Sequence, residues 1–166
     1  MMKPLLLLVV ALASFGCAGI GKTVDYDPAV SFHEYQRFEW ATDAAGVQES
    51  DERKAVRAVF DAYLTAGGYR WVRANPDFLV HFHMAPEGFD FPEAYRTLGY
   101  RPSRNLPINL DGRLYSSDAL VLDVIDRESR ELVWRGVATR VFHGLTGAFV
   151  RVELGVDILM RSFPPG

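Results

Sequence analysis

Residues 115–142 read YSSDALVLDVIDRESRELVWRGVATRVF, and this stretch decides the fold class. Residues 115–126 and 132–142 are rich in β-branched and other apolar side chains, which favours two β-strands. Residues 126–130, Asp-Arg-Glu-Ser-Arg, are polar and predict a turn between them. Two strands joined by so short a turn pair as a hairpin, so we expect an antiparallel sheet.

Further strands are predicted upstream of this hairpin, at residues 23–27, 35–40 and 77–84. In the last of these the side chains must alternate between two faces, because successive residues of a strand point in opposite directions. One face carries Phe78, Val80, Phe82 and Met84, and the other carries Leu79, His81 and His83.

Two segments are predicted as helices. In residues 50–66, Ser50 is a suitable N-cap, Gly67 with Gly68 ends the helix, and the apolar residues recur at helical spacing. Residues 147–162 fit a strand or a helix, and we favour a helix because the sheet needs a second covering element. The predicted fold class is α+β, an antiparallel sheet of about five strands with two helices packed on one face.

Composition excludes several classes of protein. The chain has 166 residues, of which 49% are hydrophobic and 23% charged, which predicts one globular domain rather than a disordered chain. A net charge of −3 provides no basic field for nucleic acid. The single cysteine cannot form an internal disulfide, and the spacing of Cys and His matches no zinc finger. We expect no cofactor.

The N-terminus resembles a bacterial lipoprotein signal. Lys3 precedes an apolar run at residues 5–13, which is too short to span a bilayer as a helix. Gly16-Cys17 resembles the lipobox, which implies cleavage between these residues and lipidation of Cys17. Residues 1–16 are then a signal peptide, residues 17–22 a lipidated tether and residues 23–166 the folded domain. The alternative is that Cys17 is buried or idle after ordinary cleavage.

The residue after the lipidated cysteine helps to sort such lipoproteins. Ala18 is not the aspartate associated with inner-membrane retention, so the resemblance implies the outer membrane, with the domain in the periplasm. The membrane is then a partner only through the lipid anchor.

Residues 16–23 match the phosphate-binding pattern G-x-x-x-x-G-K-[ST]. A phosphate loop needs a helix that begins at its Lys-Thr pair, whereas residues 24–28 alternate like a strand and reach a proline. We therefore expect no nucleotide binding.

Residues 85–113 form a long insert without clear periodicity, and such loops are often functional. Its aromatic and Arg side chains are types that dominate interface hot spots, which makes it a candidate site for an envelope protein or glycan partner. An equally weighted alternative is that these rings cover the open face of the sheet. The candidate partner-binding residues are Phe89, Phe91, Tyr95, Tyr100 and Arg101.

His81 and His83 lie two residues apart on one strand face, so both side chains can reach one metal, with His33 and His143 as further candidates. A half-exposed face that tolerates polar rings explains them more simply, and we predict no metal. No nucleophile elbow is present, so no catalytic residues are assigned. Arg135 is expected to point to an open face, beside a structural Trp134 and Gly136.

Several short segments, in order, resemble the DUF4136 family of bacterial lipoproteins of unknown function. They are residues 24–27, 32–41, 64–69, 77–80, 120–126, 132–136, 158–159 and 163–165. The resemblance covers nearly the whole mature chain except the insert. It implies an antiparallel sheet with two helices on one face, and it supplies no activity.

The sequence therefore predicts a lipid-anchored, periplasm-facing accessory or binding module that is not an enzyme. Two alternatives stay open: a metal-assisted hydrolase that uses His81 and His83, and a carrier of a small apolar ligand.

Overall fold

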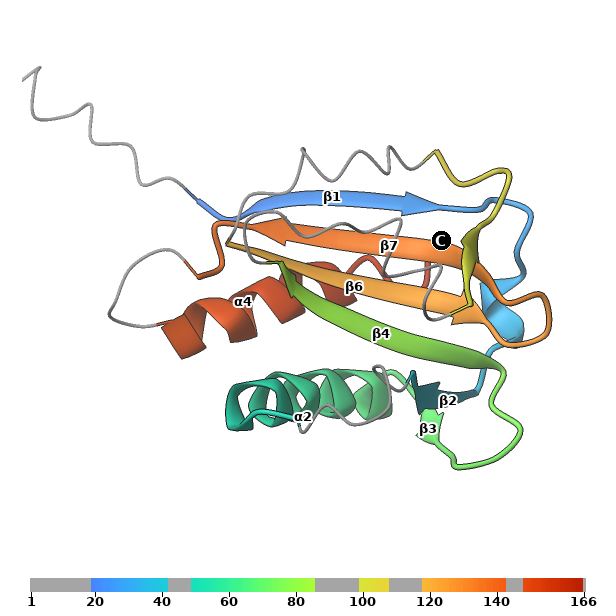
Figure 1. Ribbon diagram of the computed structural model, residues 1–166, viewed down its shortest axis with the longest axis horizontal. Helices are drawn as coiled ribbons and strands as arrows, with labels where there is room; N and C mark the ends of the chain where they lie inside the picture. Colours follow the sequence, from blue (N-terminus) through green and yellow to red (C-terminus); the bar gives the residue numbers. More distant parts are fainter. Residues whose placement is uncertain (1–18, 42–48, 86–98, 108–117, 143–147, 166) are drawn as a thin grey trace, which may run out of the picture.

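The computed structural model describes residues 19–41, 49–85, 99–107, 118–142 and 148–165. The strands are β1 Gly21–Tyr26, β2 Arg37–Trp40, β3 Arg70–Trp71, β4 Phe78–Ala85, β5 Arg101–Pro102, β6 Ala119–Asp126 and β7 Glu131–Thr139. The helices are α2 Asp51–Ala66 and α4 Ala148–Met160, with a short 3-10 helix η1 at Phe32–Glu34. All seven strands belong to one sheet (Figure 1).

The strand order is β1-β7-β6-β4-β2-β3, and β5 pairs with β7 outside this path. The prediction of an α+β fold is confirmed. Two details are corrected: among the described residues the sheet has seven strands rather than about five, and it is mixed rather than purely antiparallel. The short strands β3 and β5 were missed because two residues carry no periodic pattern.

The hairpin predicted from residues 115–142 forms the middle of the sheet as β6 and β7. Its turn is closed by Asp126, whose carboxylate accepts a hydrogen bond from the Ser129 amide at 2.7 Å. The register shifts between Val124 and Ile125, so Val133 lies opposite no residue of β6. This bulge lets both Val133 and Trp134 pack in the main core.

The parallel pairing arises from the chain between β2 and β4. The chain leaves β2, forms α2 and returns as β3, and a helical crossover of this kind returns a strand in the same direction. Both β3 and β4 accordingly pair with β2 in parallel. The predicted order of strand, helix and strand allows such a crossover but does not say which strands pair.

Both predicted helices are present. The Ser50 hydroxyl accepts a hydrogen bond from the Arg53 amide at 3.3 Å and caps α2, and Gly68 takes a left-handed backbone (φ 90°) just after its end. The ambiguous C-terminal segment forms α4 and is a helix, as favoured. In the part of the chain that the structure describes, no helix is long and apolar enough to cross a membrane.

The main core lies between the sheet and the two helices. Its buried side chains include many aromatic rings, which meet edge to face or stacked. Tyr63 of α2 donates a hydrogen bond to Asp157 of α4 at 3.0 Å and ties the two helices together. The largest contributors are Phe38, Trp40, Phe60, Phe78, Phe82, Trp134 and Phe163. We call this side of the sheet the helix face.

The opposite side of the sheet, which we call the second face, has a smaller apolar cluster formed by Leu106, Ala119, Val121, Ile125, Leu132 and Val137. Leu106 comes from the region of the insert, and Tyr100 packs against the same cluster. Residues 99–107 of the insert therefore cover part of the sheet. The alternation predicted for residues 77–84 is confirmed: Phe78, Val80 and Phe82 belong to the helix face, and Leu79 belongs to the second face.

Candidate functional site

A row of polar side chains crosses the second face from strand to strand. His81 of β4 lies opposite Asp123 of β6, and Asp123 lies opposite Arg135 of β7. Arg135 in turn lies opposite Asp25 of the edge strand β1. His83 follows His81 by two residues and therefore points to the same face. The sheet register brings these groups together although they are far apart in sequence.

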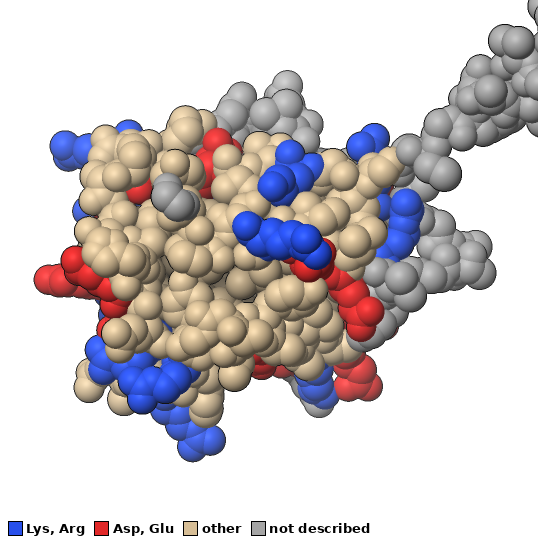
Figure 2. Space-filling model, turned by 180° about the vertical axis from the view of Figure 1, so that it is seen from behind, with Lys and Arg blue, Asp and Glu red and all other residues tan. Residues whose placement is uncertain are grey.

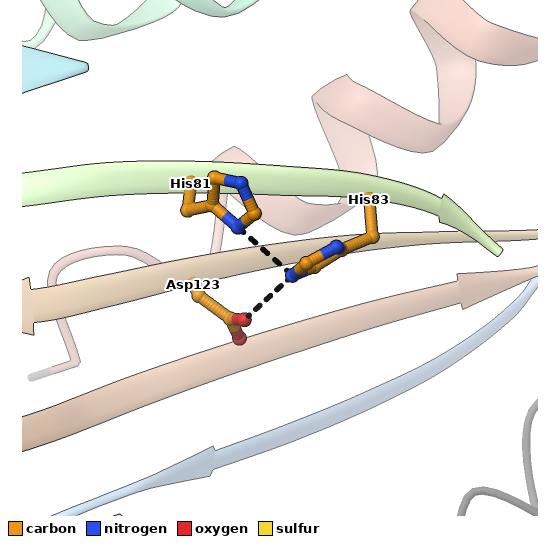
Figure 3. Close-up of side chains that lie close together, drawn as sticks. All are labelled: His81, His83 and Asp123. Atoms are coloured by element: carbon orange, nitrogen blue, oxygen red, sulfur yellow. Dashed lines mark hydrogen bonds and ion pairs between the residues drawn. The ribbon is translucent and has the colours of Figure 1, made fainter. Parts of the chain in front are cut away.

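His81, His83 and Asp123 form the β4 end of this row (Figure 3). The Nδ1 of His81 lies 2.9 Å from the Nε2 of His83, and that Nε2 lies 3.6 Å from Oδ2 of Asp123. The two imidazole rings meet edge to face, with centroids 4.1 Å apart. All three side chains are buried, with exposed fractions of 4%, 6% and 0%. The cluster is thus held within the protein rather than in solvent.

Arg135 of β7 forms two hydrogen bonds with the carboxylate of Asp123. Its Nε donates to Oδ1 at 2.7 Å and its other guanidinium nitrogen, Nη2, donates to Oδ2 at 2.9 Å. Both side chains are fully buried. A two-bond contact of this kind fixes the orientation of the carboxylate.

Burial shapes the electrostatics of this pair. Burial raises the pKa of Asp123 and lowers the pKa of Arg135 to about 9, because removing either charge from water is costly. The nearby charge of Asp25 opposes the shift in the pKa of Arg135. Arg135 is therefore protonated at neutral pH, and its two hydrogen bonds favour the ionised form of Asp123.

Two sequence-based expectations are wrong here. His81 and His83 were expected on a half-exposed face, and Arg135 on an open one, but all three are buried. The cause is that the second face carries its own covering cluster and that the polar groups pair with one another across the strands. Of the further histidines, His33 is exposed on η1, and His143 lies outside the described residues.

Sequence reasoning missed Asp123 as a member of the site. The signal was present, since Val121, Asp123 and Ile125 alternate with the helix-face residues of the same strand. What the sequence did not supply was the pairing of β4 with β6 and its register, which places Asp123 beside His81. The expected structural role of Gly136 is confirmed, because a Cβ there would lie 2.5 Å from the Trp134 ring.

The candidate partner-binding residues divide between described and undescribed parts of the chain. Phe89, Phe91 and Tyr95 lie outside the described residues, as do the cleavage and lipidation positions Gly16 and Cys17. Tyr100 is half-buried against the second-face cluster, and Arg101 is exposed, with an ion pair to Glu131 at 3.0 Å. Only part of the predicted aromatic surface is therefore described.

A cleft of about 180 Å³ opens beside Tyr100, near the β6–β7 turn. Arg127 and Arg130 line it from the turn, and Glu39 lines it from β2. The Arg130 guanidinium lies 5.5 Å from the centre of the Tyr100 ring, within the range of a cation–π contact. Two guanidinium groups and one carboxylate give this cleft a net positive character.

A second cleft, of about 260 Å³, lies between the C-terminal ends of the two helices. Its lining is mainly apolar and includes Tyr63, Tyr69, Met160 and Phe163. It lies below the range of roughly 300–1,000 Å³ that is usual for small-molecule sites. This volume is small for a protein that carries apolar ligands.

Comparison with known proteins places this chain among relatives of unknown activity. A family model described as "Domain of unknown function (DUF4136)" matches residues 22–165. A DUF4136 family protein from Bacteroides thetaiotaomicron VPI-5482 has a similar structure, with a TM-score of 0.58, 15% identity and coverage of 87% of this chain and 94% of that one.

A PDZ domain protein from Parabacteroides distasonis ATCC 8503 has a TM-score of 0.53 and 13% identity, over 95% of this chain and 39% of that longer one. Among curated proteins, no sequence matches this one. At these identities the likeness shows the fold alone, and function has to be argued from the sites of this chain.

Proposed function

The chain belongs to the DUF4136 family, and from that premise we propose that it is a lipid-anchored accessory module of the cell envelope, which binds a protein partner and catalyses no reaction. The family description assigns no activity, so the proposal rests on this chain's own residues. The anchor places the module at the outer membrane, with its domain in the periplasm.

The proposed anchor lies close to the folded domain. Strand β1 begins at Gly21, four residues after Cys17. Extended chain spans at most about 3.6 Å per residue, so four residues span roughly 14 Å. A lipid on Cys17 would hold the start of β1 near the membrane surface. Lys22 and Thr23 lie in this strand rather than at a helix N-terminus, the position that a phosphate loop requires.

The observation that carries the proposal is the direction of the sheet. Gly21 pairs with Thr139 at one end of β7, and Arg101 pairs with Glu131 at the other end (Figure 1). At about 3.3 Å per residue, the eight steps from 131 to 139 span roughly 26 Å. With one end tethered, the end that carries Arg101 and the 180 Å³ cleft points away from the membrane.

The chemistry of that far end suits an acidic protein segment. Arg101 is exposed there, with an ion pair to Glu131, and Arg127 and Arg130 line the adjacent cleft next to the Tyr100 ring. Tyr and Arg are enriched at the centres of protein interfaces, and guanidinium groups bind carboxylates through paired hydrogen bonds. The side of the molecule seen in Figure 2 carries charges of both signs among its described residues.

The anchor is tested by metabolic labelling with a palmitate analogue. The wild-type chain is expected to take up label at Cys17, and mass spectrometry is expected to find the mature N-terminus at that residue. The Cys17→Ala variant is expected to remain unlabelled. Label that persists in Cys17→Ala would refute lipidation at this position.

The partner surface is tested by a photo-crosslinking residue at position 101 in living cells. An adduct with an envelope protein is expected there. The matched control is position 154 in α4, on the helix face. Leu154 is also exposed, with 49% of its surface accessible. Equal adducts at both positions, no adduct at position 101, or an adduct with glycan instead of protein would contradict the proposed protein interface.

A further inference from the structure

Three atoms of types that bind metals converge on the second face. Two imidazole nitrogens and a carboxylate oxygen, from His81, His83 and Asp123, all lie within 4.8 Å of one another. Histidine and carboxylate ligands in this ratio form zinc sites in proteins. We propose that these three residues bind one divalent transition-metal ion, with zinc as the reference ion. This site is independent of the proposed anchor and partner surface.

The distances between the ligand atoms suit such an ion. In a tetrahedral zinc site with bonds of about 2.0–2.1 Å, the ligand atoms lie roughly 3.3 Å apart. The observed separations are 2.9 Å between the two histidine nitrogens and 3.6 Å between His83 and Asp123. These two values lie on either side of the tetrahedral spacing and within about 0.4 Å of it. The third pair of ligand atoms, from His81 and Asp123, lies within 4.8 Å.

The backbone holds the three ligands on rigid elements. His81 and Asp123 are direct partners in the antiparallel pairing of β4 with β6, and His83 lies two residues further along β4 (Figure 3). Sites built on strands hold their geometry better than sites on loops. Burial of all three side chains also removes the competition of bulk water for the ion.

Arg135 acts as a positioning residue for the third ligand. Its two hydrogen bonds occupy one acceptor site on each oxygen of Asp123. An ionised carboxylate has about four acceptor sites, so these two hydrogen bonds alone do not occupy all of them. Hydrogen-bonded carboxylates of this kind are common around metal ligands, where they fix the ligand orientation.

The three residues supply three of four positions in a tetrahedral site. The fourth position is taken by water or by another donor. Such a ligand set is compatible with either a structural or a catalytic metal, and the proposal concerns binding. In the competing account the same atoms form only a hydrogen-bonded network, with a proton shared between His81 and His83.

The test is titration of the full mature chain with Co²⁺, followed by displacement with Zn²⁺. Cobalt in a tetrahedral site absorbs visible light, and the expected result is a band that saturates at one equivalent and disappears on addition of zinc. The variants His81→Gln and His83→Gln retain a polar side chain, and each is expected to weaken binding by at least roughly tenfold.

The matched control is His33→Gln, because His33 lies on η1 with 82% of its side chain exposed and takes no part in the cluster. Its affinity for cobalt is expected to equal that of the wild type. Circular dichroism of each variant establishes that it is folded. X-ray absorption of the zinc-loaded wild type requires no variant, and it is expected to show two imidazole ligands with bonds near 2.0 Å.

The proposal is overturned if the folded wild type takes up no cobalt or zinc. It is also overturned if folded His81→Gln and His83→Gln variants bind as tightly as the wild type, or if binding is lost in His33→Gln instead. A zinc spectrum without two imidazole ligands has the same consequence.

Discussion

The two faces of the sheet differ in the kind of side chain that they bury. On the helix face, aromatic rings from strands and helices fill the space, and shape decides whether they fit. On the second face, a buried arginine, an aspartate and two histidines lie within a smaller apolar cluster. Here the pairing of charges and hydrogen bonds decides whether the arrangement is stable. One sheet can therefore have one face stabilised by apolar packing and another stabilised by pairing of buried polar groups.

The difference follows from the alternation of side chains along each strand. In β6 the helix-face positions are all apolar, whereas the second face carries Asp123 between Val121 and Ile125. Substitutions that change volume should therefore act on the helix face, and substitutions that change charge should act on the second face.

The largest effect is expected from Arg135→Met. This variant keeps most of the side-chain volume and leaves the buried Asp123 carboxylate without its two hydrogen bonds from the guanidinium. Removing one partner of a buried pair costs about 3–5 kcal/mol of unfolding free energy. Urea unfolding measures this loss.

The control for that variant is Arg161→Met. Arg161 also forms an ion pair, with Asp157 at 3.0 Å, but its side chain is 75% exposed. Pairs in solvent contribute little, so its stability should stay close to that of the wild type. Equal losses in the two variants would show that burial does not increase the contribution of the Arg135–Asp123 pair to the unfolding free energy.

A smaller effect is expected from Gly136→Ala on the helix face. The added Cβ would lie 2.5 Å from the Trp134 ring and 3.0 Å from Leu159. The ring is buried and rigid, so the core has to shift, at a cost of roughly 1–3 kcal/mol. Thermal unfolding measures it against Gly19→Ala, where no atom lies within 4 Å of the added Cβ. An unchanged Gly136→Ala would contradict close packing at this point.

The smallest effect is expected at Asp77, in the turn before β4. A hydrogen bond from Arg37 holds the pKa of Asp77 below its usual value of 3.8, with the amides of Gln36 and Arg37 adding to the effect. Because the folded-state pKa is depressed, this group stabilises the fold at pH values above its unfolded pKa. The contribution is lost as the pH falls through the folded-state pKa.

Asp77→Asn should therefore make the unfolding free energy less dependent on pH in the acid range, because the variant has no carboxylate to protonate there. The measurement is urea unfolding of both proteins between pH 7 and acid pH. A variant with the same acid dependence as the wild type would show that this turn does not contribute to it.

Much of the fold was predictable because its signals are local. The cap at Ser50, the apolar spacing of α2 and the turn at residues 126–130 each act within a few residues. The parallel pairing of β2 with β4 was missed because it depends on which strands are neighbours in space. β3 and β5 are too short for any period to be visible.

The candidate site was only half predictable for the same reason. Two histidines on one strand are visible in the sequence, but Asp123 and Arg135 join them only through the register of three strands. A charged residue in the middle of an apolar strand was the available signal. Such a residue is rarely buried unless it is paired, so its position predicts a partner on a neighbouring strand.

The central claim is that Asp123 and Arg135 act as one unit that shapes the second face. A double-mutant cycle tests this most directly, with urea unfolding of Asp123→Leu, Arg135→Met, the double variant and the wild type. Each single variant leaves one buried charge without its partner, whereas the double variant leaves neither. We predict that the double variant loses less unfolding free energy than the two single variants lose in sum, by about 2–3 kcal/mol. Losses that add to within about 0.5 kcal/mol would contradict the claim.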